Sequence, residues 1–233
     1  MPLTHDEFNA EVVRFVDDVA NAANCLDTEW SIDQKMASAD RLRAVVDAVI
    51  PLRGPGDGSD GGLAELLVNF KLCVDSYGTH VAVEHSSFVL KAPSKLDRTP
   101  IIRWDYDRSP NNKPRSHVQL TAHRGALSHI LSRLGHDTPH SIESLHVPMG
   151  GERFRPCLED VIEFLIRDCG FKGGPNWKQA IRDGRARCRR IQTRAVVRDS
   201  PASAIAELEA LGYQITPPEG GGRDERTDRL TTW

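Results

Sequence analysis

Cysteine is scarce in this chain, and its spacing excludes a disulfide framework. The 233 residues include five cysteines, an odd number, and no two of them form a Cys-x-x-Cys pair. Small secreted proteins held together by disulfides carry paired cysteines at closer spacing. We therefore expect reduced thiols in a cytoplasmic protein that binds no cofactor.

Long apolar runs are also missing. No stretch approaches the roughly 18 uninterrupted apolar residues that cross a bilayer, and the first residues lack a basic region followed by an apolar run. Six of the ten residues at 53–62 are Gly or Pro, but no phosphate-binding glycine motif is present. We expect a soluble protein with no membrane partner, and a flexible linker over 53–62.

Charge is nearly balanced over the whole chain but not within its parts. The formal net charge is -3, yet residues 1–50 hold ten acidic residues against four basic ones. Residues 171–198 hold nine basic residues and a single acidic one, Asp183. The acidic and basic segments could bind each other, or each could face a separate partner.

The apolar patterns that are present predict an α+β fold, with a small and mainly antiparallel sheet packed by helices. Thr4 and Glu7 are spaced as a capping box before a helical apolar stripe, and Ser31 and Gln34 repeat that spacing. The expected organisation is an N-terminal helical hairpin (1–52), the flexible linker (53–62), an α+β core domain (63–216) and a disordered tail (217–233).

The core domain is expected to begin with a helix, continue with strands and end with helices. Apolar residues at helical spacing predict the first helix over 63–74. From Thr79 to Leu90 the period of two predicts two short strands or one bulged strand. Further patterns predict strands at 101–107, 116–123 and 144–147, and helices near 127–134, 156–169, 177–198 and 201–211.

Polar residues gather on one side of the strands expected at 101–107 and 116–123. In a hairpin, the packed side would carry Ile102, Trp104, Tyr106, Val118, Leu120 and Ala122. The opposite side, expected to face solvent, would carry Arg103, Asp105, Asp107, His117, Gln119, Thr121 and His123.

This polar face contains the groups that general acid–base chemistry needs. A carboxylate beside a histidine fixes its tautomer and raises its basicity, and a nearby arginine can hold a phosphate. We therefore take His117, Asp105 and Arg103 as candidate catalytic residues for phosphodiester cleavage. No metal is expected, because His-x-His pairs and acid-rich spacing are missing. The alternative is an ordinary solvated sheet face.

Two arginines precede the helix expected at 156–169. The segment Gly150–Cys157 brings Arg153 and Arg155 to the helix start, where free amides attract anions. This arrangement predicts either a phosphate site or a simple helix-entry turn.

The helix expected at 177–198 is strongly basic, and its candidate nucleic-acid contacts are Arg185, Arg189, Arg190 and Arg194. A stripe of one charge neutralises phosphates, and the lack of interleaved aromatic residues predicts contact with the nucleic-acid backbone only. The alternative is that the stripe docks on the acidic N-terminal hairpin.

Several segments resemble a group of uncharacterised actinobacterial proteins over roughly residues 80–215. The segments that carry the resemblance are Ile102–Asp107, Ser116–Gln119, Leu145–Pro148 and Arg153–Asp160. A fainter similarity, through Arg103, Asp105 and His117, is to RNA-targeting toxins of bacterial toxin–antitoxin pairs. That second resemblance implies RNA as a substrate.

Two classes of function follow from the sequence. The first is a nucleic-acid-directed protein, a ribonuclease-like toxin or a mobile-element factor, that binds RNA or DNA. The second is a non-catalytic module whose acidic hairpin and basic helix bind protein partners.

Overall fold

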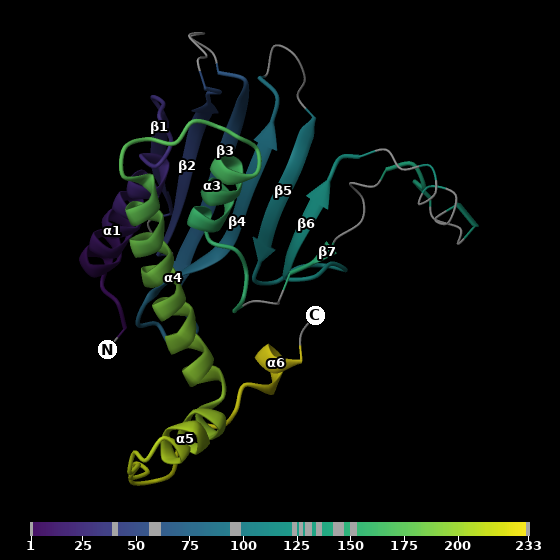
Figure 1. Ribbon diagram of the computed structural model, residues 1–233. Helices are drawn as coiled ribbons and strands as arrows, with labels where there is room; N and C mark the ends of the chain where they lie inside the picture. The colour runs from purple at the N-terminus through teal and green to yellow at the C-terminus, as the bar shows by residue number, and fades with distance from the viewer. Residues whose placement is uncertain are drawn as a thin grey trace.

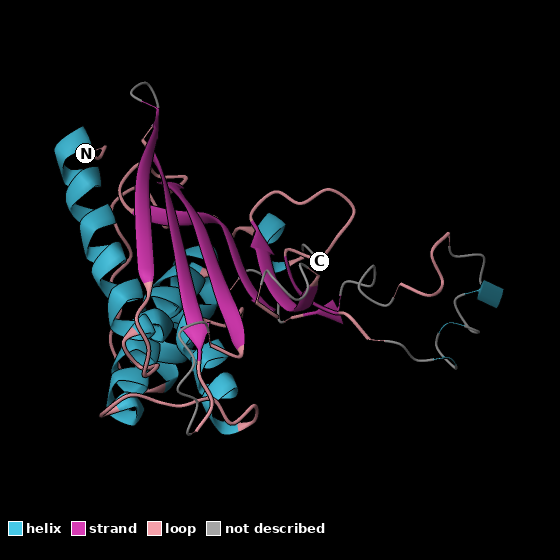
Figure 2. Ribbon diagram, turned by 90° about the horizontal axis from the view of Figure 1, so that it is seen from above, coloured by secondary structure: helices cyan, strands magenta, loops and turns pink. Residues whose placement is uncertain are grey.

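The protein is an α+β structure in which helices cover one face of a single sheet (Figures 1 and 2). The computed structural model describes residues 2–38, 42–55, 62–93, 99–122, 125, 128, 132–133, 137–141, 147–149 and 153–231. The helices are α1 (His5–Ala23), α3 (Leu158–Arg167), α4 (Trp177–Asp199), α5 (Pro201–Ala210) and α6 (Thr227–Leu230).

The sheet is an antiparallel meander in which each strand pairs with the next strand of the chain. Its seven strands are β1 (Ser31–Ser38), β2 (Arg43–Leu52), β3 (Ala64–Val74), β4 (Val81–Lys91), β5 (Pro100–Asp107), β6 (Ser116–Leu120) and β7 (Val147–Pro148).

The helices predicted after residue 31 and over 63–74 are wrong, because these segments form β1, β2 and β3. Every second residue of β2 and β3 is buried, which is the signature of a strand packed on one face. The same segments also place apolar residues at helical intervals, and pairing between β2 and β3 decides the outcome. Only α1 of the expected hairpin is a helix, and residues 53–62 lie between two paired strands.

The segment 81–91 is one bulged strand, the second of the two alternatives that its sequence allows. The register moves from Lys71 opposite His85 to Leu72 opposite Val83, so Glu84 is an extra residue in β4. The bulge directs the Glu84 carboxylate to the Arg43 guanidinium, 2.7 Å away.

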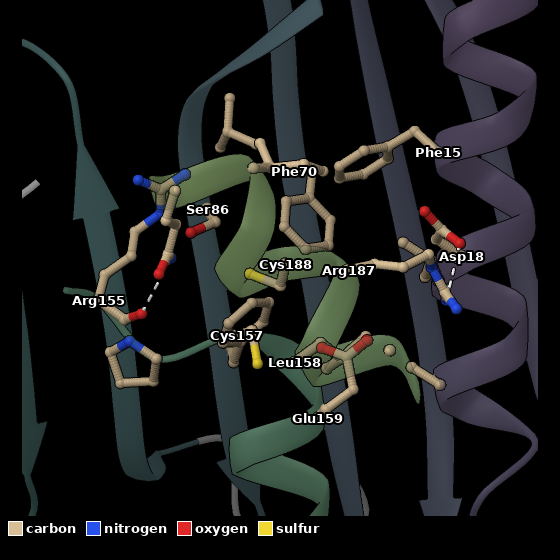
Figure 3. A pocket seen from close by; sticks show the side chains of 18 residues that line it. Phe15, Asp18, Phe70, Ser86, Arg155, Cys157, Leu158, Glu159, Arg187 and Cys188 are labelled. Atoms are coloured by element: carbon tan, nitrogen blue, oxygen red, sulfur yellow. Dashed lines mark hydrogen bonds and ion pairs between the residues drawn. The ribbon is translucent and has the colours of Figure 1, made fainter. Parts of the chain in front are cut away.

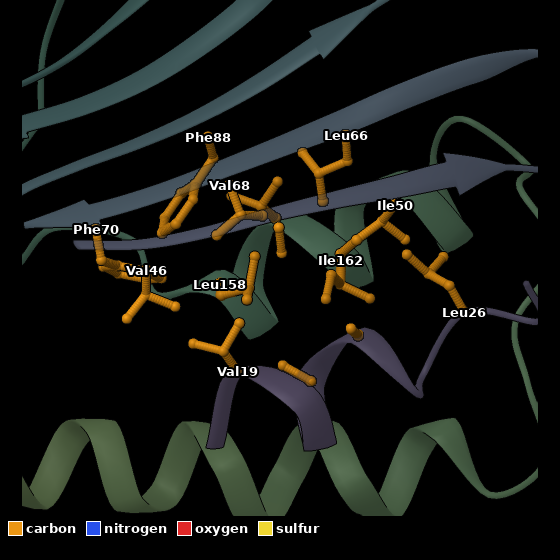
Figure 4. Close-up of a cluster of buried hydrophobic side chains, with 14 of the residues drawn as sticks. Val19, Leu26, Val46, Ile50, Leu66, Val68, Phe70, Phe88, Leu158 and Ile162 are labelled. Carbon is orange, nitrogen blue, oxygen red and sulfur yellow. The ribbon is translucent and has the colours of Figure 1, made fainter. Parts of the chain in front are cut away.

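The core lies between the sheet and helices α1, α3 and α4 (Figure 4). The expected capping box starts α1, with the Glu7 amide donating to the Thr4 hydroxyl and the Thr4 amide donating to the Glu7 carboxylate. Burial of each large apolar side chain contributes about 1.5–3 kcal/mol. The helix and sheet residues that meet there include Val19, Leu158, Ile162, Val46, Val68, Phe70 and Phe88.

The C-terminal helices match the predictions from sequence, and the tail does not. Helices α3, α4 and α5 all form at the expected places. The segment predicted to be disordered instead returns to the end of α4, where the Arg226 amide donates to the Asp199 carbonyl at 2.8 Å. The Ser200 hydroxyl lies 2.8 Å from the Glu225 carboxylate. These contacts hold the segment that leads into α6.

Two predicted elements fall largely outside the described residues. These are the helix near 127–134 and most of the strand at 144–147, of which Val147 forms part of β7. Among the described residues, every helix is too short or too polar to cross a bilayer.

Candidate functional site

The hairpin of β5 and β6 brings the predicted catalytic residues together. Asp105 and His117 are direct cross-strand partners, as the shared polar face predicts. The Asp105 carboxylate lies 3.8 Å from His117 Nε2 and 2.9 Å from Arg103 Nη2. It also accepts a hydrogen bond of 2.6 Å from the Ser87 hydroxyl on β4.

The expectation that this face is open to solvent is wrong at its centre. Asp105 is 5% exposed and His117 is 1% exposed. The chain between the two strands folds back along them, since the Asp107 amide donates to the Arg115 carbonyl and His117 Nδ1 lies 3.0 Å from the Pro114 carbonyl. Neither Asp105 nor His117 lines the polar hollow beside α4 or the cavity between the sheet and helices α1, α3 and α4.

The pair belongs to a polar row that crosses the sheet. Asp47, Asn69, Ser87, Asp105 and His117 occupy matching register positions on successive strands. The Asn69 amide donates to the Asp47 carboxylate at 2.7 Å, just as Ser87 donates to Asp105. Hydrogen bonds between buried polar groups fix register and stabilise the fold, so the Asn69–Asp47 and Ser87–Asp105 bonds support a structural role for the row.

A larger polar hollow lies beside the C-terminal half of α4. We call it the arginine groove, because seven arginines and only three acidic residues line its volume of about 400 Å³. The arginines are Arg108, Arg153, Arg155, Arg194, Arg198, Arg226 and Arg229, and the acids are Glu11, Asp75 and Asp199.

The three acids of the arginine groove already have partners. Glu11 pairs with Arg14 on α1. Asp75 accepts hydrogen bonds from two backbone amides, at 2.8 and 3.2 Å. The buried Asp199 carboxylate takes two hydrogen bonds from Arg153, at 2.6 and 3.2 Å. Asp199 therefore neutralises Arg153. Arg226 and Arg229 pair with Asp228, so the excess of positive charge comes from the other four arginines of the groove.

The arginines of the groove come from segments that are far apart in sequence. Arg153 is fixed by Asp199, and the Arg155 guanidinium stacks on the Tyr106 ring with its carbon 3.9 Å from the ring centre. Arg194 and Arg198, on α4, make no hydrogen bond or ion pair with any residue the structure describes. Free guanidinium groups at the edge of a fixed cationic wall can bind an anion.

The four predicted nucleic-acid contacts of α4 divide into two pairs. Arg185 binds both Asp160, at 2.6 Å, and Glu163 on α3, and Arg189 lies 3.1 Å from Asp160. Arg190 and Arg194 have no such partner within the described parts of the chain. The first pair therefore holds α3 against α4, and only the second pair is available to a ligand.

The alternative in which the basic helix docks on the acidic N-terminal hairpin is met by one ion pair among the described residues, because the first half of α4 docks mainly on α3. Most of its acidic partners lie on α3, although Arg187 does bind Asp18 of α1 at 2.8 Å. Burial opposes ionisation of Asp160, but hydrogen bonds from the Cys157 amide and Arg185 outweigh it and lower its pKa.

A second hollow, the inner cavity, lies between the sheet and helices α1, α3 and α4 (Figure 3). It has a volume of about 160 Å³ and mainly apolar walls. Two thiols line it. The direct interaction of the two thiols raises the pKa of Cys157, as burial does, and it lowers the pKa of Cys188 against the effect of burial. Sequence reasoning missed this cavity, because its walls come from five separate elements.

The described residues contain no group of three or more side chains suited to hold a metal ion. Compared with protein-family models, with curated proteins and with solved structures, the chain matches none.

Proposed function

We propose that the protein binds the phosphate backbone of a nucleic acid along the arginine groove and the exposed arginines of α4. The observation that supports this function best is the composition of the groove, where seven arginines and three acids line the hollow and only three of these arginines form a described ion pair with Asp199 or Asp228. Guanidinium groups bind phosphate oxygens bidentately, and each neutralised phosphate releases counterions to solvent.

The aromatic residues near the groove support backbone binding without base recognition. Tyr106 is covered by Arg155, and the ring of Tyr77 is covered by Arg223 at 4.6 Å. An arginine therefore covers one face of each ring, which leaves less ring surface to stack on a nucleobase, the usual basis of base preference on single strands. Binding is therefore expected to depend on charge and shape, with little preference for sequence.

The test is a titration of the full chain with a short labelled single-stranded RNA and a DNA duplex at several salt concentrations. The Arg194→Gln, Arg198→Gln double variant should flatten the dependence of log affinity on log salt by about two units for two lost phosphate contacts. The matched control is the Lys178→Gln, Arg182→Gln double variant, which removes two charges from the far end of the same helix. The control should keep the slope of the unaltered protein.

Two results would overturn the proposal. One is an equal loss of slope in both double variants, because the salt dependence would then reflect the net charge of the protein and not contacts made in the groove. The other is binding to an acidic peptide such as polyglutamate without binding to nucleic acid, which would favour the protein-interaction alternative.

The same samples test the predicted cleavage. Intact RNA after incubation is the result expected from binding alone. RNA fragments that disappear with His117→Gln would assign ribonuclease activity to the buried Asp105–His117 pair.

A further inference from the structure

The inner cavity contains a buried carboxylate that lacks a partner. Glu159, on the first turn of α3, is 8% exposed and lines the cavity (Figure 3). None of the described residues forms a hydrogen bond or an ion pair with its carboxylate. The carboxylate lies directly against Gly184 of α4, where any larger side chain would collide with it.

Glu159 lies on the first turn of α3, and no described cation pairs with its carboxylate. The N-terminal turn of a helix favours a negative charge through the free amides and the helix dipole. The two arginines of the cavity wall contact other groups, since Arg187 Nη2 binds Asp18 at 2.8 Å and Arg155 stacks on Tyr106, but the buried Arg187 Nε makes no hydrogen bond to any described residue. A buried charge without a partner is strongly unfavourable.

The rest of the cavity is shaped for a small apolar body. Its walls carry rings and aliphatic groups from the sheet and three helices, namely Phe15, Val19, Phe70, Phe88, Leu158 and Ile191. The volume of about 160 Å³ compares with the roughly 150 Å³ of a protein cavity that binds benzene. One aromatic ring or a short alkyl chain fills such a space.

A second polar side chain lines the cavity, apart from Glu159 (Figure 3). Ser86 on β4 is 4% exposed and lines the cavity. Its hydroxyl has no hydrogen-bond partner among the residues that the structure describes.

We propose that the inner cavity binds a small organic amine, with the ammonium group paired to Glu159 and the apolar body against the rings of Phe70 and Phe88, which pack edge to face on each other. An ammonium ion supplies both the missing charge and the missing hydrogen-bond donors. A hydrocarbon of the same size would leave Glu159 unpaired, and an organic acid would be repelled by it. This site is distinct from the arginine groove and does not depend on nucleic-acid binding.

The test uses the full chain and three ligands that differ only in their polar group, benzylamine, benzyl alcohol and toluene. Isothermal titration should show that benzylamine binds at least about tenfold more tightly than the other two, as a charge-assisted pair predicts. In Glu159→Gln, this preference should disappear while toluene binding stays the same. Glu163→Gln, which removes a carboxylate from the surface of the same helix, should keep the preference.

Three outcomes would overturn the proposal: no benzylamine binding by the unaltered protein, equal binding by Glu159→Gln, or toluene binding as tight as that of benzylamine. A measurement on the unaltered protein covers the case in which Glu159→Gln fails to fold. Magnetisation transfer from bound benzylamine to the rings of Phe15, Phe70 and Phe88 is expected in NMR spectra, and its absence would place the ligand elsewhere.

Discussion

Asp105 on the sheet and Glu159 on α3 are both almost completely buried, and they differ in their surroundings. Asp105 lies in a row of cross-strand neighbours and has Ser87, Arg103 and His117 within reach. Glu159 faces a cavity and has no described partner. The comparison separates two uses of a buried charge, because a satisfied carboxylate holds the fold together and an unsatisfied one is ready for a ligand.

The largest effect is expected at the satisfied carboxylate. Asp105→Ala removes the acceptor for Ser87 and Arg103 and leaves both His117 and Ser87 buried beside a void. We expect a loss of about 3 kcal/mol in the free energy of unfolding, at the lower end for a broken buried pair because Arg103 is 40% exposed. Urea unfolding measures it. A loss below about 1 kcal/mol would show that the row does not stabilise the sheet.

Asp160 offers a second satisfied carboxylate, directly beside Glu159. Asp160→Asn weakens the bonds to Arg185 and Arg189, and we expect it to lower the free energy of unfolding by about 2 kcal/mol at neutral pH. Its pKa lies below the ordinary value of 3.8, and hydrogen bonds from Arg185 and Arg167 lower that of Glu163 below 4.5. The ionised forms therefore stabilise the fold fully above these ordinary values, and the contribution is lost as the pH falls through the lower folded values.

The pH dependence of stability provides the control for the Asp160→Asn prediction. Stability measured by thermal unfolding should fall between pH 5 and pH 2, and the fall should be smaller in Asp160→Asn. An equal fall in both proteins would place the acid-sensitive groups elsewhere.

A smaller effect is expected where only one partner of Asp105 is removed. Ser87→Ala deletes a single hydrogen bond of 2.6 Å in the row, and a loss of about 1 kcal/mol is typical of such a bond. Urea unfolding of the Ser87→Ala, Asp105→Ala double variant should show non-additivity, because the two side chains touch. Strictly additive losses would mean that the bond contributes nothing.

The smallest effect, and one of opposite sign, is expected at the unsatisfied carboxylate. Glu159→Gln removes a buried charge that no described residue compensates, so the melting temperature should stay the same or rise, with a gain of at most about 1 kcal/mol. Differential scanning calorimetry without ligand measures this. A clear decrease would mean that Glu159 is already satisfied, and its contrast with Asp105 would disappear.

Local sequence patterns correctly predicted those helices and strands for which the different local signals all indicate the same secondary structure. The capping box of α1, the helices α3 to α5 and the shared face of Asp105 and His117 all follow from short-range spacing, whereas the register that places these two residues opposite each other does not. Strands β1 to β3 did not, because their apolar residues satisfy a helical and a strand period at once, and pairing with distant strands decides between them.

The candidate sites were less accessible from sequence than the fold. The basic character of α4 was evident, but only three-dimensional packing separates Arg185, which binds α3, from Arg194, which does not. The other arginines that line the groove with Arg194, such as Arg108 and Arg226, lie too far from it in the sequence for any spacing rule to connect them. Glu159 looked like an ordinary first-turn acid.

The strand order of the sheet also determines when during synthesis its apolar face is covered. Strands pair in the order in which they leave the ribosome, so the meander can assemble early. Of its helical cover, however, only α1 precedes the sheet, while α3 and α4 follow β6 and end at Asp199. At about 5–20 residues per second, the nascent sheet waits roughly 4–16 s between Leu120 and Asp199. During that interval its half-covered face is a binding surface for chaperones, and chains truncated before α4 should aggregate.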